Sequence, residues 1–155
     1  MHRLDGCDYA IKIWPMLHSD SASELKLIAW LQNNCPKESL AHIVRYHWSW
    51  QEERIGYMVL EHCKFSLRKF ARLWRYESFA GLTEQDVIRV LRDTCLGLKG
   101  LHMLGVVHLD IKPENILCSR DETFKISDFG LARRLCDFLE KGEQEIPEGD
   151  ERYLA

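Results

Sequence analysis

The sequence predicts an α+β fold in which a sheet-rich first third is followed by a mostly helical remainder. Apolar residues alternate with polar ones in segments before residue 61, and a long helical repeat of apolar positions follows residue 83. Because strands and helices are segregated along the chain, we expect two lobes rather than an alternating βαβ sheet. We place the division after residue 63, giving a partial N-terminal lobe over 1–63 and the first part of a helical lobe over 64–155.

The first strand and the first helix are predicted from the spacing of their side chains. In 7–14, Tyr9, Ile11 and Ile13 occupy alternate positions, which indicates a strand. Ser19–Ser21 offers N-cap side chains for a helix that we expect to run to residue 32 and to end before Pro36. Its predicted apolar stripe comprises Leu25, Ile28, Ala29 and Leu31.

The next elements are two strands and a short helix. We expect strands over 43–50 and 55–60, joined by the polar residues 51–54, and a helix over 66–76. Four tryptophans in this part of the chain are expected to pack in the core and between the lobes: Trp30, Trp48, Trp50 and Trp74.

The strongest helix signal begins at Thr83 and ends at Gly105. Thr83 is a candidate N-cap, and Asp86 lies three residues further on, as a capping box requires. The apolar positions Val87, Val90, Leu91, Leu98 and Leu101 recur at helical spacing. Beyond this helix we expect short extended pieces at 106–107, 116–118 and 124–126, and an exposed polar loop around 141–145.

The composition of the chain is that of a globular protein and excludes several classes. The hydrophobic fraction is 46%, and the net charge of -3 gives no support for a nucleic-acid or membrane-surface partner. The six cysteines have no zinc-like or disulfide-like spacing, which indicates a reducing compartment, nucleus or cytosol. We find no apolar run near the roughly 20 residues of a membrane span, and Met1–Asp5 lacks the apolar stretch of a signal peptide.

Two motifs carry the chemistry. Residues 108–115 read H-L-D-I-K-P-E-N, and D-F-G follows at 128–130. These stretches resemble the catalytic loop H-x-D-x-K-x-x-N and the D-F-G triplet of protein kinases, and Y-A-I-K at 9–12 is similar to their V-A-I-K motif. The resemblance implies a two-lobed protein-kinase-like fold that uses ATP and Mg²⁺ to phosphorylate a hydroxyl of a protein substrate.

The resemblance also implies a role for each matched residue. Asp110 would accept the proton of the substrate hydroxyl, and Lys112 would reach the transferring phosphate. Asn115 and Asp128 would bind Mg²⁺, which prefers hard oxygen ligands. Lys12 would hold the α- and β-phosphates. A lone polar loop residue is usually a turn or cap residue. Here several matched polar residues and the D-F-G triplet follow the predicted helix together, which favours the functional interpretation.

The adenine side of the site is expected at the junction of the two lobes. By the same resemblance, the backbone of Glu61 to Cys63 would form the hinge that hydrogen-bonds adenine, with Leu60 behind it. Ala10 and Leu117 would lie above and below the ring. We expect the Cys63 thiol to be inert.

Glu24 is the candidate for the helix carboxylate that pairs with Lys12. It lies on the correct predicted helix, twelve residues after Lys12, which is a shorter interval than kinases usually show. The alternative is a first-turn glutamate that is favoured only by the helix dipole.

A finer resemblance is to the Wee/Myt family of mitotic-inhibitor kinases, with the Wee branch favoured. It rests on R-L-D-G-C at 3–7, H-I-V-R-Y at 42–46 and, above all, E-G-D-E-R-Y-L-A at 148–155. This likeness implies an inhibitory tyrosine of a cyclin-dependent kinase as the substrate and the nucleus as the location, with the cytoplasm left open. Lys112 is typical of serine/threonine kinases, so the motif leaves the acceptor residue open.

Leu109 adds a physical argument about regulation. Most kinases carry an arginine there, which pairs with a phosphate on the activation loop. Leucine cannot make that pair, and Glu148–Asp150 offers no hydroxyl for such a phosphate. We therefore expect activity that does not depend on loop phosphorylation.

The resemblance further implies a kinase fold that is incomplete at both ends. The glycine-rich loop is expected before Met1, and Ala155 would open the A-P-E motif. We expect this fragment alone to leave apolar faces uncovered and to be inactive. Two alternatives remain open: a serine/threonine kinase of another branch, and a non-catalytic kinase-like scaffold.

Overall fold

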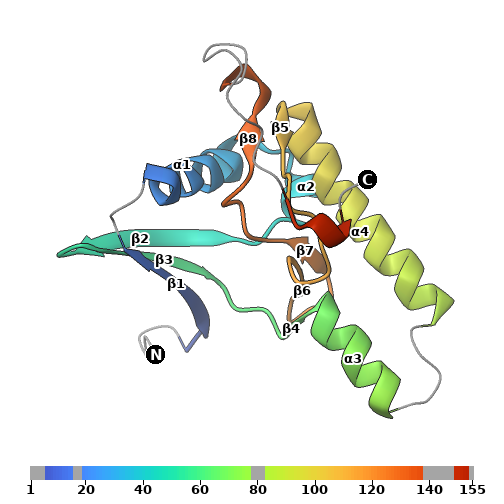
Figure 1. Ribbon diagram of the computed structural model, residues 1–155. Coiled ribbons are helices and arrows are strands. Elements are labelled where there is room, and N and C mark those ends of the chain that lie inside the picture. Colours follow the sequence, from blue (N-terminus) through green and yellow to red (C-terminus); the bar gives the residue numbers. More distant parts are fainter. Residues whose placement is uncertain (1–5, 16–18, 78–82, 138–148, 154–155) are drawn as a thin grey trace.

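The computed structural model describes residues 6–15, 19–77, 83–137 and 149–153 (Figure 1). Its first sheet is antiparallel with the strand order β1-β3-β2 and comprises β1 (Tyr9–Pro15), β2 (Tyr46–Glu52) and β3 (Ile55–Glu61). Glu53 at the β2–β3 turn has a φ of 53°, a left-handed conformation that suits a tight hairpin. The strands predicted at 7–14 and 55–60 are confirmed within one or two residues.

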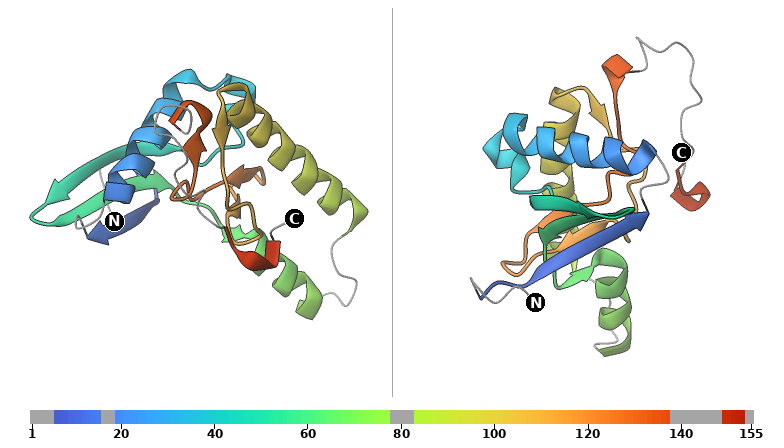
Figure 2. Two further views of the ribbon diagram at one scale, coloured as in Figure 1. Left: turned by 45° about the horizontal axis from the view of Figure 1, so that its top comes forward. Right: turned by 90° about the vertical axis from the view of Figure 1, so that its left-hand side faces the viewer.

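Helix α1 (Ser19–Asn34) packs on the face of this sheet that carries Lys12 and Met58 (Figures 1 and 2). Ile28 and Leu31 of the predicted stripe are buried, and Leu27 is buried as well. The helix runs two residues beyond the predicted end. It ends with the side-chain amides of its two terminal asparagines donating to the carbonyls of Ala29 and Trp30.

The predicted strand at 43–50 is wrong at its start, because strand β2 begins only at Tyr46. The preceding residues pair instead with the second half of the chain: Val44 N–H donates to Ile126 O over 2.9 Å, and Ile126 N–H donates to His42 O over 2.9 Å. Ile43 and Val44 are each 1% exposed. These two β-branched side chains are therefore buried between the two halves, and the division at residue 63 is bridged by this segment.

The second half contains a small antiparallel sheet of order β4-β6-β7, beside two longer helices. The elements of this half of the chain are β4 (Phe65–Ser66), α3 (Leu67–Glu77), α4 (Glu84–Met103), β5 (Val106–Val107), β6 (Ile116–Cys118), β7 (Phe124–Ile126), β8 (Arg133–Arg134) and the 3₁₀ turn η1 (Glu151–Tyr153). A short helix, α2 (Lys37–Leu40), precedes β2 and packs against α4. The chain crosses from the first sheet to the second between β3 and β4 (Figure 1).

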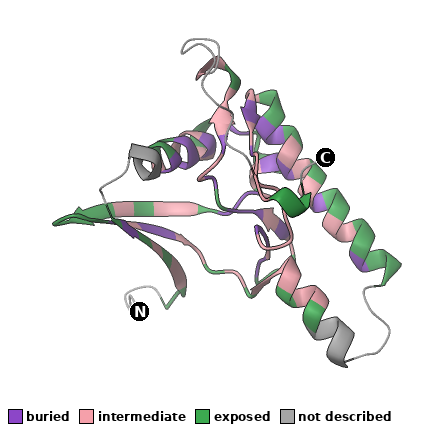
Figure 3. Ribbon diagram, in the orientation of Figure 1, coloured by how far each residue is buried: buried purple, intermediate pink, exposed green. Residues whose placement is uncertain are grey.

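Helix α4 starts as predicted. The Thr83 hydroxyl accepts from Asp86 N–H over 3.1 Å, and the Asp86 carboxylate accepts from Thr83 N–H over 3.2 Å, which completes the capping box. Two of the apolar positions that recur at helical spacing are not buried, however: Val87 is 42% exposed and Leu91 is 59% exposed. Leu101 is buried as the spacing indicates, and the buried strip of the helix also contains Gly97 and Gly100 (Figure 3).

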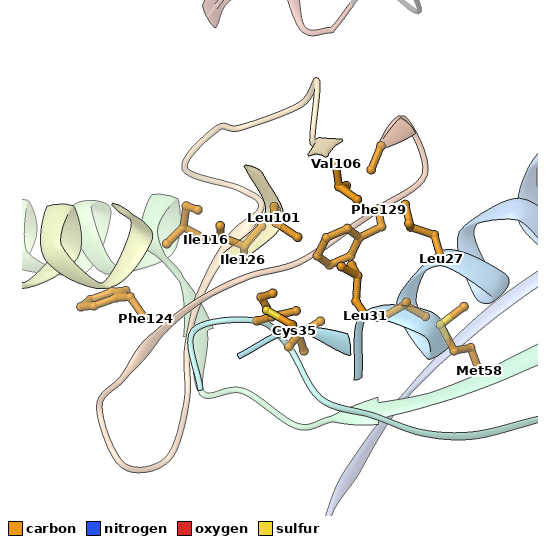
Figure 4. Close-up of a cluster of buried hydrophobic side chains, with 14 of the residues drawn as sticks. Leu27, Leu31, Cys35, Met58, Leu101, Val106, Ile116, Phe124, Ile126 and Phe129 are labelled. Atoms are coloured by element: carbon orange, nitrogen blue, oxygen red, sulfur yellow. The ribbon is translucent and has the colours of Figure 1, made fainter. Parts of the chain in front are cut away.

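A continuous hydrophobic core joins the two halves (Figure 4). Phe129 of the D-F-G triplet is 1% exposed and lies in the same cluster as Leu27 and Leu31 from α1 and Val106 from β5. A fully buried side chain of this size contributes about 1.5–3 kcal/mol. Because Phe129 is anchored in the core, the backbone on both sides of it is held in place. This packing positions the preceding residue, Asp128.

Two of the tryptophans depart from the prediction, whereas Trp30 packs against the hydrophobic core as predicted. Trp48 and Trp50 are each 40% exposed, since they lie on the face of the first sheet opposite Lys12, where they line a cavity of about 800 Å³. Trp30 is half-buried, with the Arg134 guanidinium 4.7 Å from its ring centroid. The side chains of Trp74 and of the candidate caps at 19–21, and the polar loop at 141–145, lie outside the described residues.

Candidate functional site

The first cluster of site residues comprises Lys12, Glu24 and Asp128. Strand alternation places Lys12 on the α1 side of the sheet, and α1 presents Glu24 to it. Lys12 Nζ lies 2.7 Å and 2.9 Å from the two Glu24 oxygens and 2.9 Å from Asp128 Oδ1. The pairing of Lys12 with Glu24 that the sequence predicts is therefore present, despite the short interval between them.

The charges of this cluster stabilise one another. Burial acts to lower the pKa of Lys12, but hydrogen bonds and charge attraction from Glu24 and Asp128 outweigh it and raise the pKa above its ordinary value. Burial acts to raise the pKa of Asp128, and the hydrogen bond and charge of Lys12 reverse this effect and lower it. The cluster thus holds an ammonium beside an ionised carboxylate, an arrangement suited to phosphate and metal ligands.

The second cluster comprises Asp110, Lys112 and Asn115. Asn115 Nδ2 donates to Asp110 Oδ2 over 2.8 Å and to Asp110 O over 2.9 Å. Lys112 Nζ lies 2.9 Å from the same Oδ2. Because these two donors fix one carboxylate oxygen, the Asp110 side chain is held in one orientation.

His108 connects the two clusters through hydrogen bonds to Asp110 and to Ser127, the residue before Asp128. It is 2% exposed, its Nε2 lies 3.1 Å from Ser127 O, and its Nδ1 accepts from Asp110 N–H over 3.3 Å. A carbonyl can only accept, so Nε2 carries the proton and the ring is neutral. Ser127 also donates through N–H and Oγ to Asn115 O, each over 2.9 Å, so the residue before Asp128 is tied to both motifs.

Backbone strain occurs at both motifs. Leu109 has a φ of 64° and Asp128 a φ of 62°. For residues with a Cβ this left-handed conformation costs on the order of 1 kcal/mol or more and is found preferentially at functional sites. The buried neighbours His108 and Phe129 supply the packing that maintains it.

The predicted adenine-side residues are divided between the sheets: Ala10 and Leu60 lie at the end of the first sheet, and Leu117 lies in the second. Ala10 and Leu60 are directly opposite each other in the β1–β3 register, on the same face as Lys12. The Glu61 carboxylate binds Lys125 over 2.9 Å and so joins β3 to β7. Cys63 is half-buried; burial, followed by the Glu61 charge, raises the pKa of its thiol to about 12, which agrees with an inert thiol. Leu117 is half-buried on β6, two residues after Asn115.

The donor set fits magnesium. Because Asn115 Nδ2 is used by Asp110, its Oδ1 is the atom left to bind a cation, and the ionised Asp128 supplies a carboxylate. Mg²⁺ usually takes one or two protein oxygens and completes its shell with phosphates and water. Within the described ranges no three His, Cys, Asp or Glu side chains gather as a metal cage, and Mg²⁺ shared with a nucleotide requires none.

One part of the site was missed from the sequence. Asp150 Oδ2 lies 3.6 Å from Lys112 Nζ and 2.6 Å from Arg152 Nη2, and the Arg152 hydrogen bond holds the Asp150 pKa well below its usual range. The close spacing of Asp150 and Arg152 could have indicated their mutual pair. Nothing in the sequence indicated that Asp150 would reach the catalytic loop.

Among the helices of the described segments, none is long and apolar enough to cross a membrane.

The chain is similar to known proteins along its whole length. The model of the protein kinase domain matches residues 1–155. The Wee1-like protein kinase 1-A of Xenopus laevis is 30% identical over 172 residues, which cover 99% of this chain and 29% of that protein.

Two further relatives show the breadth of the match. The membrane-associated tyrosine- and threonine-specific cdc2-inhibitory kinase of Drosophila melanogaster is 31% identical, covering 99% of this chain and 27% of that protein. The serine/threonine-protein kinase cst-1 of Caenorhabditis elegans is 35% identical over 142 residues, covering 91% of this chain and 27% of that protein. The chain thus spans less than a third of the length of these relatives.

Proposed function

The chain belongs to the protein kinase family, and from this premise we propose that it phosphorylates an inhibitory tyrosine of a cyclin-dependent kinase, as a negative regulator of mitotic entry. The similarity to Wee1-like kinases supports the tyrosine and the substrate class. The two polar clusters support the reaction type, transfer of the γ-phosphoryl group of ATP to a protein hydroxyl.

Asp110 is the group that we assign to the acceptor hydroxyl. Its Oδ2 is fixed by Asn115 and Lys112, so we assign Oδ1 to accept the proton as the acceptor oxygen attacks. The Lys112 ammonium lies next to this carboxylate, where it can offset charge on the transferring phosphoryl group. These residues orient the acceptor and stabilise charge, which is most of what phosphoryl transfer needs.

The nucleotide is assigned to the other cluster. Lys12, held by Glu24, would bind the α- and β-phosphates, and Ala10 and Leu60 would contact the adenine ring. Asn115 and Asp128 would hold Mg²⁺, which when bound neutralises charge on the phosphates. The hydrogen bonds that the Ser127 N–H and hydroxyl donate to Asn115 O keep Asn115 and Asp128 at a fixed distance from each other.

The orientation of Asp110 by Asn115 and Lys112 carries this proposal, and it predicts a specific loss. In the full-length protein, Asp110→Asn should reduce transfer to a tyrosine peptide by at least about a thousandfold while leaving the thermal stabilisation by Mg-ATP intact. Asp8→Asn, at an exposed aspartate before β1, is the matched control and should keep full activity. A wild type without Mg-dependent stabilisation by ATP, and without loss on Asp110→Asn, would instead support a non-catalytic scaffold.

A serine/threonine acceptor is the second candidate. The observations that favour it are the Lys112–Asp110 pair, in the motif typical of such kinases, and the identity to the kinase cst-1. Matched peptides that differ only in tyrosine, serine or threonine at the acceptor position decide between the two. Preferred transfer to serine or threonine would contradict the tyrosine assignment.

We also propose that the enzyme works in the nucleus and without a phosphate on its activation loop. Support for the second point is that Leu109 stands where most kinases have a phosphate-binding arginine, and that Asp150 already supplies a negative charge to Lys112. Phosphatase-treated enzyme should retain its activity. A large loss after treatment would contradict this expectation, and imaging of the tagged protein tests the location.

A further inference from the structure

The segment Asp150–Tyr153 is placed where it influences the catalytic loop. The Asp150 carboxylate lies 3.6 Å from Lys112 Nζ, and Lys112 in turn lies 2.9 Å from Asp110. A displaced segment would therefore change the charge around Lys112 and leave its ammonium less well oriented. The question is what holds the segment in place.

Two further contacts from outside the segment hold it, in addition to the Lys112–Asp150 contact. The Arg68 guanidinium lies 3.4 Å from the Tyr153 hydroxyl, and the Glu114 carboxylate lies 3.8 Å from Arg152. Arg68 also lies 3.1 Å from Glu114, so one carboxylate bridges two guanidinium groups. We call Arg68, Glu114 and Arg152 the arginine clamp.

The clamp links three separate parts of the chain. Arg68 belongs to the first turn of α3, and its backbone N–H donates to Pro113 O over 3.0 Å. Glu114 lies on the catalytic loop between Lys112 and Asn115, and its Oε2 is buried without a hydrogen-bond partner among the described residues. Both guanidinium groups approach Oε1, so they supply the positive charge that this partly buried carboxylate needs.

We propose that Arg68 is a positioning residue for phosphoryl transfer, because it holds Glu114 and the segment Asp150–Tyr153 so that Asp150 orients Lys112. The proposal rests on the proposed kinase function. It explains how the segment is ordered where Leu109 cannot bind a loop phosphate: an arginine from α3 performs the ordering with a carboxylate of the catalytic loop. The clamp does not touch Lys12, Glu24 or Asp128, so nucleotide binding should not depend on it.

The test compares Arg68→Gln with Arg72→Gln in the full-length protein, because Arg72 is exposed one turn further along α3. For Arg68→Gln we expect kcat to fall about fivefold to tenfold with KM for ATP unchanged, since misplaced catalytic groups cost rate rather than ground-state binding. Arg68→Lys keeps the charge and should restore at least half of kcat. Arg72→Gln should resemble the wild type.

Three results would overturn the proposal: equal activities of Arg68→Gln and Arg72→Gln, a rise in KM for ATP that matches the fall in kcat, or no recovery with Arg68→Lys. Amide hydrogen exchange gives a readout that does not need activity, because Arg68→Gln should speed exchange at residues 149–153 and Arg72→Gln should not. If the wild type transfers no phosphate, the proposed function fails. The exchange rates then decide the clamp alone, and unchanged exchange in Arg68→Gln would refute it.

Discussion

Asp110 and Asp128 carry the same functional group, but their neighbours give them different tasks. Asp110 is oriented by an amide and an ammonium through one oxygen, whereas Asp128 shares the Lys12 ammonium with Glu24. The residue between the clusters, His108, is buried and must stay neutral to serve both of its hydrogen bonds. At this scale the site depends on protonation states that the local contacts impose.

His108 predicts a pH dependence of stability. Burial is the main effect on its ring and lowers its pKa below the ordinary 6.5, although Ser127, Asp110 and Asp128 act in the opposite direction. The unfolded chain therefore binds the proton first as pH falls, so the free energy of unfolding should decrease below about pH 6.5. Thermal unfolding between pH 5.5 and 7.5 measures this change.

The control for that experiment is His102, which is exposed on α4. His102→Gln should keep the wild-type decrease, and His108→Asn should lose part of it. Equal pH profiles for all three proteins would show that His108 is not the titrating group.

The Lys12–Glu24 pair predicts a change in nucleotide binding. Glu24→Gln keeps the shape of the side chain but removes the charge that orients Lys12, and a charge-assisted hydrogen bond of this kind contributes about 1.5–3 kcal/mol. The lysine is partly exposed, with 36% of its side chain accessible, so the effect should lie at the lower end. We expect KM for ATP to rise about tenfold.

Glu84→Gln, at an exposed first-turn glutamate of α4, is the matched control and should leave KM for ATP unchanged. An unchanged KM for ATP in Glu24→Gln would contradict the role that we assign to the pair.

Among the elements, helix α4 shows how packing can override helical periodicity. Its close contact with α2 and β7 involves two glycines: a Cβ at Gly100 would lie 2.4 Å from Ser39 Cβ of α2, and one at Gly97 would lie 2.8 Å from Ile126 Cδ1 of β7. The absence of side chains at these positions lets the neighbouring backbone approach closely. The apolar residues Ile88 and Leu91 are consequently left on an exposed face.

This packing predicts the sign of a mutational effect. In a solvent-exposed helix, Gly→Ala stabilises by about 0.5–1 kcal/mol. Gly100→Ala should instead destabilise by about 1–3 kcal/mol, because the methyl group overlaps atoms of Ser39 and Cys35. Chemical denaturation measures the difference, with Lys99→Ala at the exposed neighbouring position as the control. Stabilisation by Gly100→Ala would show that α2 and α4 are not in close contact.

For the whole molecule, the notable property is the amount of apolar surface on two faces. Ile11 is 52% exposed and Ile13 is 61% exposed on the outer face of the first sheet, while Ile88 and Leu91 are 57% and 59% exposed on α4. Exposed apolar side chains that gather on one face of a protein often mark interaction sites or aggregation risks.

We therefore expect the isolated 155-residue chain to bind the dye ANS and to self-associate. Replacing Ile88 and Leu91 together with serine should reduce both effects, whereas Gln85→Ser with Lys99→Ser, at polar positions of the same helix, should not. ANS fluorescence and light scattering after gel filtration provide the measurements. A monomer that binds no dye would contradict the expectation.

Local sequence patterns were sufficient to recognise the motifs at 108–115 and 128–130. They were also sufficient to predict the strands and helices with strong periodicity and the capping box at Thr83. A period of two or of 3.6, or a fixed motif spacing, is visible within a few residues, so none of these features needs a distant partner. Asp110, Lys112, Asn115 and Asp128 became candidate site residues on those grounds alone.

Other features depend on distant residues and follow only from the folded arrangement of the chain. Residues 42–44 pair with β7 rather than extend β2, and Gly97 and Gly100 rather than Val87 and Leu91 lie beside Leu101 in the buried strip of α4. Arg68 and Asp150 likewise meet the catalytic loop. The reason is physical. Burial and ion pairing depend on which side chains are neighbours in space, and the spacing of residues along one segment carries no information about a partner in a distant segment.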